Sequence, residues 1–218
     1  MAERGIEYIT SPTKRRLDVL GAVALAGIVA PVVLSASIVA GVNSRTFKPF
    51  FKQPRIGHNG DEFNVIKLQT LRDEHMTDRL QTFGTFDPRA TKVGLFMREV
   101  GIDELPQLIN VLAGDMSLVG IRPLISPDIN KMQSIDAVLF DEWYDAYTQS
   151  KPGATGPGQI YRHNYRYASD EVYRESMKVD MKYIESASLG RDLRILATTP
   201  FNLLHANLTL IENAPEVA

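Results

Sequence analysis

The stretch from Val19 to Val42, VLGAVALAGIVAPVVLSASIVAGV, constrains this chain more than any other because it contains no charged residue. About 20 apolar residues cross the hydrocarbon core of a bilayer as a straight helix, and this stretch is longer than that. We therefore predict a membrane helix. The alternatives are a signal peptide, whose apolar region is normally about 7–15 residues long, and a buried helix of a soluble domain.

The charges on both sides of this stretch bear on its topology. Lys14 to Arg16 are basic and precede it, and four further basic residues follow it, namely Arg45, Lys48, Lys52 and Arg55. Basic flanks mark the cytoplasmic side, and a spanning helix can place only one of its two ends there. Pro31 removes an intrahelical hydrogen bond near the middle and favours a bend. We predict a re-entrant membrane helix kinked near Pro31; the alternative is a single span.

The remainder of the chain has the composition of a globular domain. We predict an α+β fold that is mainly helical with few short strands, divided into a polar leader (residues 1–13), a membrane anchor (14–49) and a globular domain (50–218). Turn residues followed by an apolar run predict a hairpin or strand ending at Phe63–Leu68. Apolar spacing predicts helices over Ile135–Gln149, Val172–Ile184 and Leu193–Leu210, and glycines and prolines predict a loop over Lys151–Gln159.

Composition excludes several functional classes. A formal net charge of −2 gives no reason to expect a nucleic-acid binder. The absence of cysteine excludes disulfides, thiolate metal sites and cysteine nucleophiles. The four histidines have no HExxH spacing, so a zinc site of that type is not expected.

The stretch from Arg98 to Pro123, REVGIDELPQLINVLAGDMSLVGIRP, is the candidate site. We predict a helix with Asp103 as its N-cap, Pro106 in its first turn and Gly114 after its end. Its apolar face is predicted to contain residues at helical spacing, namely Leu105, Leu108, Ile109 and Leu112.

An acidic pair, Asp103 and Glu104, thus opens this helix between Arg98 and Arg122. Free N–H groups at a helix start favour anions, and guanidinium groups bind two phosphate oxygens at once. We interpret the stretch as a phosphate-handling site with a metal ion. The alternative is ordinary helix capping, which contributes about 0.5–2 kcal/mol.

Several ordered motifs resemble those of the monotopic polyprenol-phosphate phosphoglycosyl transferases, the bacterial sugar transferases that begin lipid-linked glycan assembly. The most specific match runs from Asp87 to Leu124. Supporting matches are KRRLD at Lys14–Asp18, QPRIGHNGDEF at Gln53–Phe63, KPGATG at Lys151–Gly156, and Asp180 with Tyr183.

The resemblance implies an enzyme that moves a phospho-sugar from a UDP-sugar to polyprenol (undecaprenyl) phosphate, for capsule, exopolysaccharide or glycoprotein assembly. It implies that Asp103 is the nucleophile of a phospho-aspartyl intermediate and that Asp103 and Glu104 lie at a Mg²⁺ ion. The groups expected to bind substrate phosphate are Arg98, Arg122 and Lys67. The nucleotide or sugar is expected at a loop containing Lys151, Pro152, Gly153, Thr155, Gly156, Gln159, Arg162 and Asn164.

The family pattern is not followed everywhere. Ala30 replaces the usual serine before the membrane proline, Gln69 an arginine, Pro157 a tryptophan and His163 an arginine. Since two of these departures lie in the donor loop, the sugar is not predicted.

The resemblance further implies a monotopic protein of the inner membrane with its catalytic domain on the cytoplasmic face. The expected partners are the UDP-sugar, polyprenol phosphate and membrane lipid, and a homodimer is compatible with the sequence. Two alternatives remain: an inactive membrane-anchored scaffold for glycan assembly, and a metal-dependent phosphohydrolase in which water is the acceptor.

Overall fold

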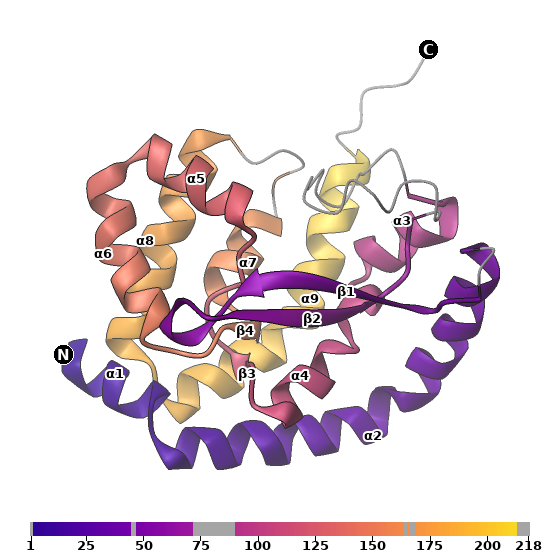
Figure 1. Ribbon diagram of the computed structural model, residues 1–218, viewed down its shortest axis with the longest axis horizontal. Coiled ribbons are helices and arrows are strands. Elements are labelled where there is room, and N and C mark those ends of the chain that lie inside the picture. Colours follow the sequence, from indigo (N-terminus) through magenta and orange to yellow (C-terminus); the bar gives the residue numbers. More distant parts are fainter. Residues whose placement is uncertain (1, 45–46, 72–89, 164, 166–168, 213–218) are drawn as a thin grey trace.

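The computed structural model describes residues 2–44, 47–71, 90–163, 165 and 169–212. Within these ranges the predicted mainly helical fold with few short strands is confirmed (Figure 1). The helices are α1 (Ala2–Ile9), α2 (Pro12–Asn43), α3 (Lys92–Glu99), α4 (Gln107–Ala113), α5 (Ser126–Ile135), α6 (Ala137–Thr148), α7 (Pro157–His163), α8 (Asp170–Ser186) and α9 (Leu189–Glu212). The strands are β1 (Phe50–Ile56), β2 (Glu62–Leu68), β3 (Ser117–Val119) and β4 (Gly153–Thr155).

Helix α2 contains the apolar stretch. It begins where Ser11 caps it by accepting a hydrogen bond from the Lys14 N–H at 3.0 Å, with Pro12 at a position where no N–H is needed. Helical structure continues through Pro31 to Asn43. Of the described residues, this helix is long and apolar enough to cross a membrane, and 11% of its most apolar stretch is buried in the protein.

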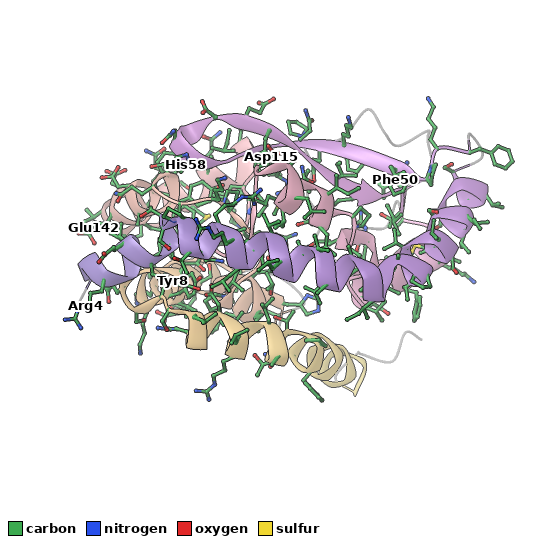
Figure 2. The ribbon with its side chains drawn as sticks, turned by 90° about the horizontal axis from the view of Figure 1, so that it is seen from below. Arg4, Tyr8, Phe50, His58, Asp115 and Glu142 are labelled. Carbon is green, nitrogen blue, oxygen red and sulfur yellow. The ribbon has the colours of Figure 1, made fainter. Side chains whose placement is uncertain are left out.

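Figures 1 and 2 show how α2 lies against the rest of the molecule. It runs along the lower side of the body in Figure 1 and turns upward toward its C-terminal end. Seen from below, it crosses the body between the hairpin on one side and α9 on the other (Figure 2). The first half of α2 buries Lys14, Asp18 and Ala22, whereas Leu20 and Ile28 are exposed. One face of the first half of α2 therefore packs against the body of the protein, and the opposite face is exposed.

Two small sheets organise the body. β1 and β2 form an antiparallel hairpin, which confirms the strand predicted at Phe63–Leu68. β3 and β4 pair in parallel, with Ser117 opposite Gly153 and Val119 opposite Thr155. The core between the sheets and the helices contains fully buried apolar side chains, among them Val65, Val111, Met116, Trp143 and Tyr147. The predicted helices near residues 135, 172 and 193 correspond to α6, α8 and α9.

The loop predicted over Lys151–Gln159 is wrong in part. Its middle forms β4, and α7 begins at Pro157. The glycines allow the two parallel strands to approach closely: a Cβ at Gly153 would lie 2.1 Å from the Gly120 nitrogen, and one at Gly156 would lie 1.9 Å from the Gly120 oxygen. The same residues that disfavour regular structure in isolation are thus required for this pairing.

The helix predicted to begin at Asp103 also differs. Gly101 adopts a left-handed conformation with φ of 73°, a 3-10 turn follows at Ile102–Glu104, and α4 begins only after Pro106. Pro106 has no N–H to donate, so the α-helical bonding starts beyond it. Asp103 is therefore not an N-cap. Gly114 does end the helix, with φ of 101°.

The predicted apolar face of α4 is also wrong in part. The residues that α4 buries are Gln107, Asn110 and Val111, whereas Ile109 and Leu112 are 53% and 39% exposed. The buried face is thus mostly polar, and the Asn110 amide on it bonds to the backbone of β2.

Candidate active site

Glu104 is the centre of the candidate site. Its Oε1 lies 2.7 Å from the Lys67 Nζ and 2.9 Å from the Arg122 Nη2. Its Oε2 accepts longer hydrogen bonds of 3.4 Å from Arg122 Nη1 and from Gln159 Nε2. Three elements that are distant in sequence, namely β2, the segment after β3 and α7, therefore meet at one carboxylate.

Asp103 lies next to this cluster but differs from Glu104. It is 7% exposed and forms no hydrogen bond or ion pair with any residue that the structure describes. Its oxygens are not among the buried polar atoms that lack a partner, so they reach the surface and can contact a ligand or a metal ion.

The two carboxylates are therefore electrostatically unlike. Burial and the neighbouring charge of Glu104 raise the pKa of Asp103 to about 6, although Lys67, Arg98 and Arg122 partly offset this. Burial acts on the pKa of Glu104 in the same direction, but Arg122 and Lys67 hold that pKa well below its usual range. At neutral pH both groups are mainly ionised, and only Glu104 is tightly paired.

The predicted phosphate-binding residues meet here. Lys67 and Arg122 contact Glu104 directly, and Arg98 in α3 donates from Nε to the Thr70 hydroxyl at 2.9 Å while acting electrostatically on Asp103. Burial lowers the pKa of Lys67, with Arg55 and Arg122 adding to the effect and Glu104 opposing it. Cations thus outnumber the carboxylates around the pair, which favours an additional anion.

The predicted donor loop divides into three parts. Gln159 and Arg162 lie on α7, and Gln159 reaches Glu104 through its Nε2. The Gln159 Oε1 and the Arg162 Nη2 are buried and have no hydrogen-bond partner among the described residues. Burial lowers the pKa of Arg162, and Arg122 adds to this while Asp180 opposes it. The Arg162 guanidinium therefore adds a further cation near Arg122.

The second part of the predicted loop builds the scaffold. Gly153 and Thr155 belong to β4, Gly156 packs on Gly120, and the Pro152 carbonyl accepts from the Ser117 N–H at 2.8 Å. Lys151 forms the third part. It lies at the far end of α4, where a Cβ on Gly114 would be 3.6 Å from its Nζ. Asn164 lies outside the described residues.

Several positioning residues were not predicted. Asn110 accepts from the Ile66 N–H at 3.0 Å and donates to the Asn64 carbonyl at 2.8 Å, which fixes α4 to β2 beside Lys67. The sequence did contain one indication of this role: Asn110 lies inside a predicted apolar helix, and a buried amide needs hydrogen-bond partners.

Two further residues support the site from behind. Arg55, counted in sequence as part of a basic flank, is 5% exposed and donates to the Pro123 carbonyl at 2.9 Å next to Arg122. Asp180 accepts from the Gly158 N–H at 3.1 Å and thereby holds the start of α7. Burial raises the pKa of Asp180 to about 6, although Arg162 opposes the shift.

The predicted Mg²⁺ site consists of two neighbouring carboxylates, those of Asp103 and Glu104. The described residues contain no group of three or more acidic or histidine side chains placed to hold a metal ion. Mg²⁺ is typically bound by one or two carboxylates together with substrate phosphates and water. The unpartnered Asp103 carboxylate beside Glu104 fits that mode of binding rather than a cage of protein ligands.

The fold and the site together define a protein with one long apolar helix and a carboxylate pair lined by cations, which is the arrangement expected of an enzyme that handles phosphate groups. The family model described as bacterial sugar transferase matches residues 9–206. The chain belongs to the bacterial sugar transferase family.

Curated relatives agree with this assignment. A UDP-glucose:undecaprenyl-phosphate glucose-1-phosphate transferase of Caulobacter vibrioides is 35% identical over 198 residues, which cover 88% of this chain and 69% of the relative. The exopolysaccharide production protein ExoY of Rhizobium meliloti is 32% identical over 214 residues, covering 89% and 86%. An undecaprenyl-phosphate glucose phosphotransferase of Komagataeibacter xylinus is 33% identical over 187 residues, covering 85% of this chain and 35% of the relative.

Proposed function

We propose that this protein transfers a sugar 1-phosphate from a UDP-sugar to polyprenol phosphate and so begins lipid-linked glycan assembly. The observation that carries the proposal is the unlike carboxylate pair: Asp103 is 7% exposed and has no hydrogen bond or ion pair to a described residue, whereas Glu104 is held by Lys67 and Arg122. Relatives whose names describe glucose 1-phosphate transfer to undecaprenyl phosphate support the same substrates.

The proposed reaction has two displacements. An oxygen of Asp103 forms a bond to the sugar-bearing phosphorus, and the bond from that phosphorus to the bridging oxygen breaks, which releases uridine monophosphate. An oxygen of polyprenol phosphate then attacks the same phosphorus and returns the electron pair to Asp103. The product is a polyprenyl diphosphate sugar, and the enzyme is regenerated.

The surrounding residues are suited to these steps. Lys67 and Arg122 keep Glu104 ionised and are the groups we propose for binding phosphate oxygens. Gln159 and Arg162 have buried polar atoms without a partner, which we propose for contacts with the nucleotide. Such preorganised cations offset the repulsion between a carboxylate nucleophile and an anionic diphosphate. When bound by Asp103 and Glu104, Mg²⁺ supplies further charge neutralisation for the diphosphate.

The acceptor requires a membrane, and α2 supplies the means of attachment. Its apolar stretch is mostly unburied within the protein, which supports association with lipid. We infer a monotopic topology in which α2 returns to the cytoplasmic face, on the strength of exposed basic residues at both ends, Arg16 before the apolar stretch and Lys48 and Lys52 after it. Because the chain lacks cysteine, single cysteines placed at residue 2 and after Ala218 can be labelled from each side of oriented vesicles. Labelling from opposite sides contradicts the proposal.

The covalent step is tested without acceptor. Purified protein is incubated with Mg²⁺ and a panel of UDP-sugars and examined by intact-protein mass spectrometry for a phospho-sugar adduct. We expect an adduct with at least one donor, lost in Asp103→Asn and retained in Asp141→Asn, a matched change at an exposed position.

Acceptor dependence completes the test. Adding polyprenol phosphate should discharge the adduct and release uridine monophosphate over repeated turnovers. Absence of both adduct and nucleotide release with every donor refutes the proposal and favours a scaffold. Release of sugar 1-phosphate into water without acceptor favours a phosphohydrolase.

A further inference from the structure

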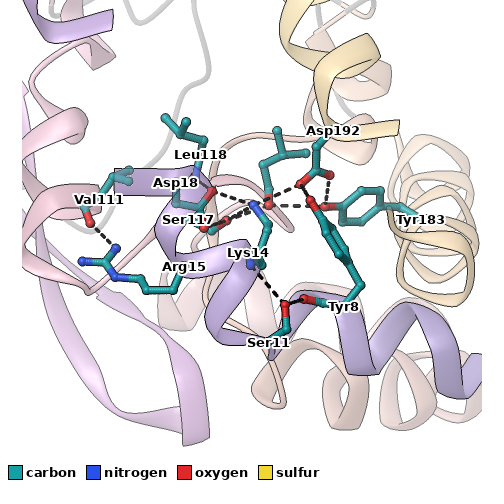
Figure 3. Close-up of polar contacts among 11 residues, drawn as sticks. Tyr8, Ser11, Lys14, Arg15, Asp18, Val111, Ser117, Leu118, Tyr183 and Asp192 are labelled. Atoms are coloured by element: carbon teal, nitrogen blue, oxygen red, sulfur yellow. Dashed lines mark hydrogen bonds and ion pairs between the residues drawn. The ribbon is translucent and has the colours of Figure 1, made fainter. Parts of the chain in front are cut away.

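The basic run before the apolar stretch is divided in the folded protein. Lys14 is 4% exposed and lies among Asp18, Asp192 and Ser117. Arg15 reaches across to α4. Arg16 is exposed and has no hydrogen bond or ion pair within the described part of the chain. Three consecutive charges that look equivalent as a topology signal therefore have different surroundings, and Figure 3 shows those of Lys14 and Arg15.

Arg15 binds the C-terminal end of α4. Its Nη1 donates to the Val111 carbonyl at 2.6 Å and its Nη2 to the Leu112 carbonyl at 3.0 Å. The last carbonyls of a helix have no partner within the helix, and a cation there also complements the helix dipole. The Gly114 N–H turns back to the Asn110 and Val111 carbonyls, so the Leu112 carbonyl depends on Arg15.

α4 in turn connects both members of the Lys67–Glu104 ion pair. At its start, the chain passes from Glu104 through Leu105 and Pro106 directly into the helix, whose first turn bonds to those two carbonyls. In its middle, Asn110 holds the β2 backbone on both sides of Val65, immediately before Lys67. A displacement of α4 therefore moves Glu104 and Lys67 together relative to Arg122.

We propose that Arg15 is a positioning residue for the carboxylate pair, through which the seating of the apolar helix on the body sets the geometry of the site. This inference rests on the proposed function. It gives the basic run a role inside the protein that is distinct from topology and from lipid attraction, and it assigns to Arg16 alone the charge that remains open to lipid headgroups.

The test compares neighbouring arginines in the full chain. Arg15→Gln and Arg16→Gln each remove one positive charge from the same turn of α2, but only Arg16→Gln removes a charge that is exposed and open to lipid headgroups. A larger loss in Arg15→Gln therefore cannot come from lipid electrostatics. Adduct formation from a UDP-sugar is measured well below the melting temperature of each variant. We expect Arg15→Gln to lower the rate about tenfold, from the loss of two charge-assisted hydrogen bonds, and Arg16→Gln to change it by no more than about twofold.

A conservative variant separates positioning from stability. Arg15→Lys keeps a cation at the end of α4 and should recover part of the rate, to within about threefold of the original. If Arg15→Gln does not fold, the rate of Arg15→Lys is compared with that of Arg16→Lys instead. The expected result is then a rate of adduct formation up to about threefold lower in Arg15→Lys than in this control.

Three results overturn the inference: equal rates for the Arg15 and Arg16 variants, a folded Arg15→Gln variant with unchanged rate and only a lower melting temperature, or no recovery in Arg15→Lys. If the unaltered protein forms no adduct with any donor, the proposed function fails and the inference falls with it. If that protein reacts and Arg15→Gln reacts equally fast, only the inference fails.

Discussion

Replacing Lys14 by methionine is expected to lower the free energy of unfolding by about 3–5 kcal/mol, the cost of breaking a buried ion pair by removing one partner. Methionine matches the length of lysine but has no charge. The substitution therefore leaves the site filled and the two carboxylates of Asp18 and Asp192 without their shared cation.

The size of the effect follows from the contacts. The Lys14 Nζ lies 2.6 Å from Asp18 Oδ1, 2.6 Å from the Ser117 hydroxyl oxygen and 3.1 Å from Asp192 Oδ2 (Figure 3). Each carboxylate keeps neutral donors after the change, since the Tyr183 hydroxyl still donates to Asp192 at 2.7 Å. Two like charges nevertheless share one buried site, whereas an exposed ion pair contributes only about 0–1 kcal/mol.

The measurement uses Trp143, the single tryptophan, which is fully buried and reports unfolding by its fluorescence. For a chain of this size about 1 kcal/mol corresponds to roughly 2–4 °C, so the melting temperature should fall by about 6–20 °C. Arg16→Met is the matched control and should change it by less than about 2 °C. A Lys14→Met variant that melts together with this control refutes the reasoning, because the buried network then contributes nothing measurable.

Four other outcomes are expected. Asp103→Asn should abolish the adduct without lowering the melting temperature at about pH 8, since burial raises the pKa of this carboxyl to about 6 and the ionised form opposes folding above that pH. The value of kcat/KM for nucleotide release should fall about tenfold per pH unit below about pH 6 as Asp103 is protonated, and a flat profile contradicts its role as nucleophile. Asn110→Asp cannot donate to the Asn64 carbonyl, so both kcat/KM and the melting temperature should fall, by about 1–3 kcal/mol in stability. Gly156→Ala would place a Cβ 1.9 Å from the Gly120 oxygen and should destabilise by about 1–3 kcal/mol in thermal melts.

Elements with a strong local period could be predicted from the sequence. The hairpin strand at Phe63–Leu68 and the helices α6, α8 and α9 each contain apolar residues at one regular spacing, and the structure confirms them. The start of α4 could not be predicted in this way. Asp103 is a good N-cap by residue type, but the left-handed Gly101 and the missing N–H of Pro106 together produce a 3-10 turn first.

The candidate site, too, could be predicted from the sequence only in part. The acidic pair and its basic neighbours could be predicted because the charged residues flank one short stretch of sequence. The partners that hold them could not, because β2 meets α4 only after folding: Asn110 lies 46 positions from Asn64 and 44 from Ile66. Glycines and prolines predicted a loop over Lys151–Gln159, although the close packing of β3 on β4 is what requires the glycines.

The basic run of Lys14 to Arg16 shows why residue type alone is insufficient. Successive residues of an α-helix point about 100° apart, so three adjacent side chains cannot share one environment. Lys14, Asp18 and Ala22 recur every four residues and are buried, which places Lys14 on the docked face and Arg16 away from it. The opposite charges at i and i+4 were a visible sign of such a face. The remaining partners of Lys14 were not visible, since Ser117 lies 103 positions along the chain. A positive charge before an apolar helix therefore indicates topology only when its side chain stays exposed in the fold, and here that condition holds for Arg16.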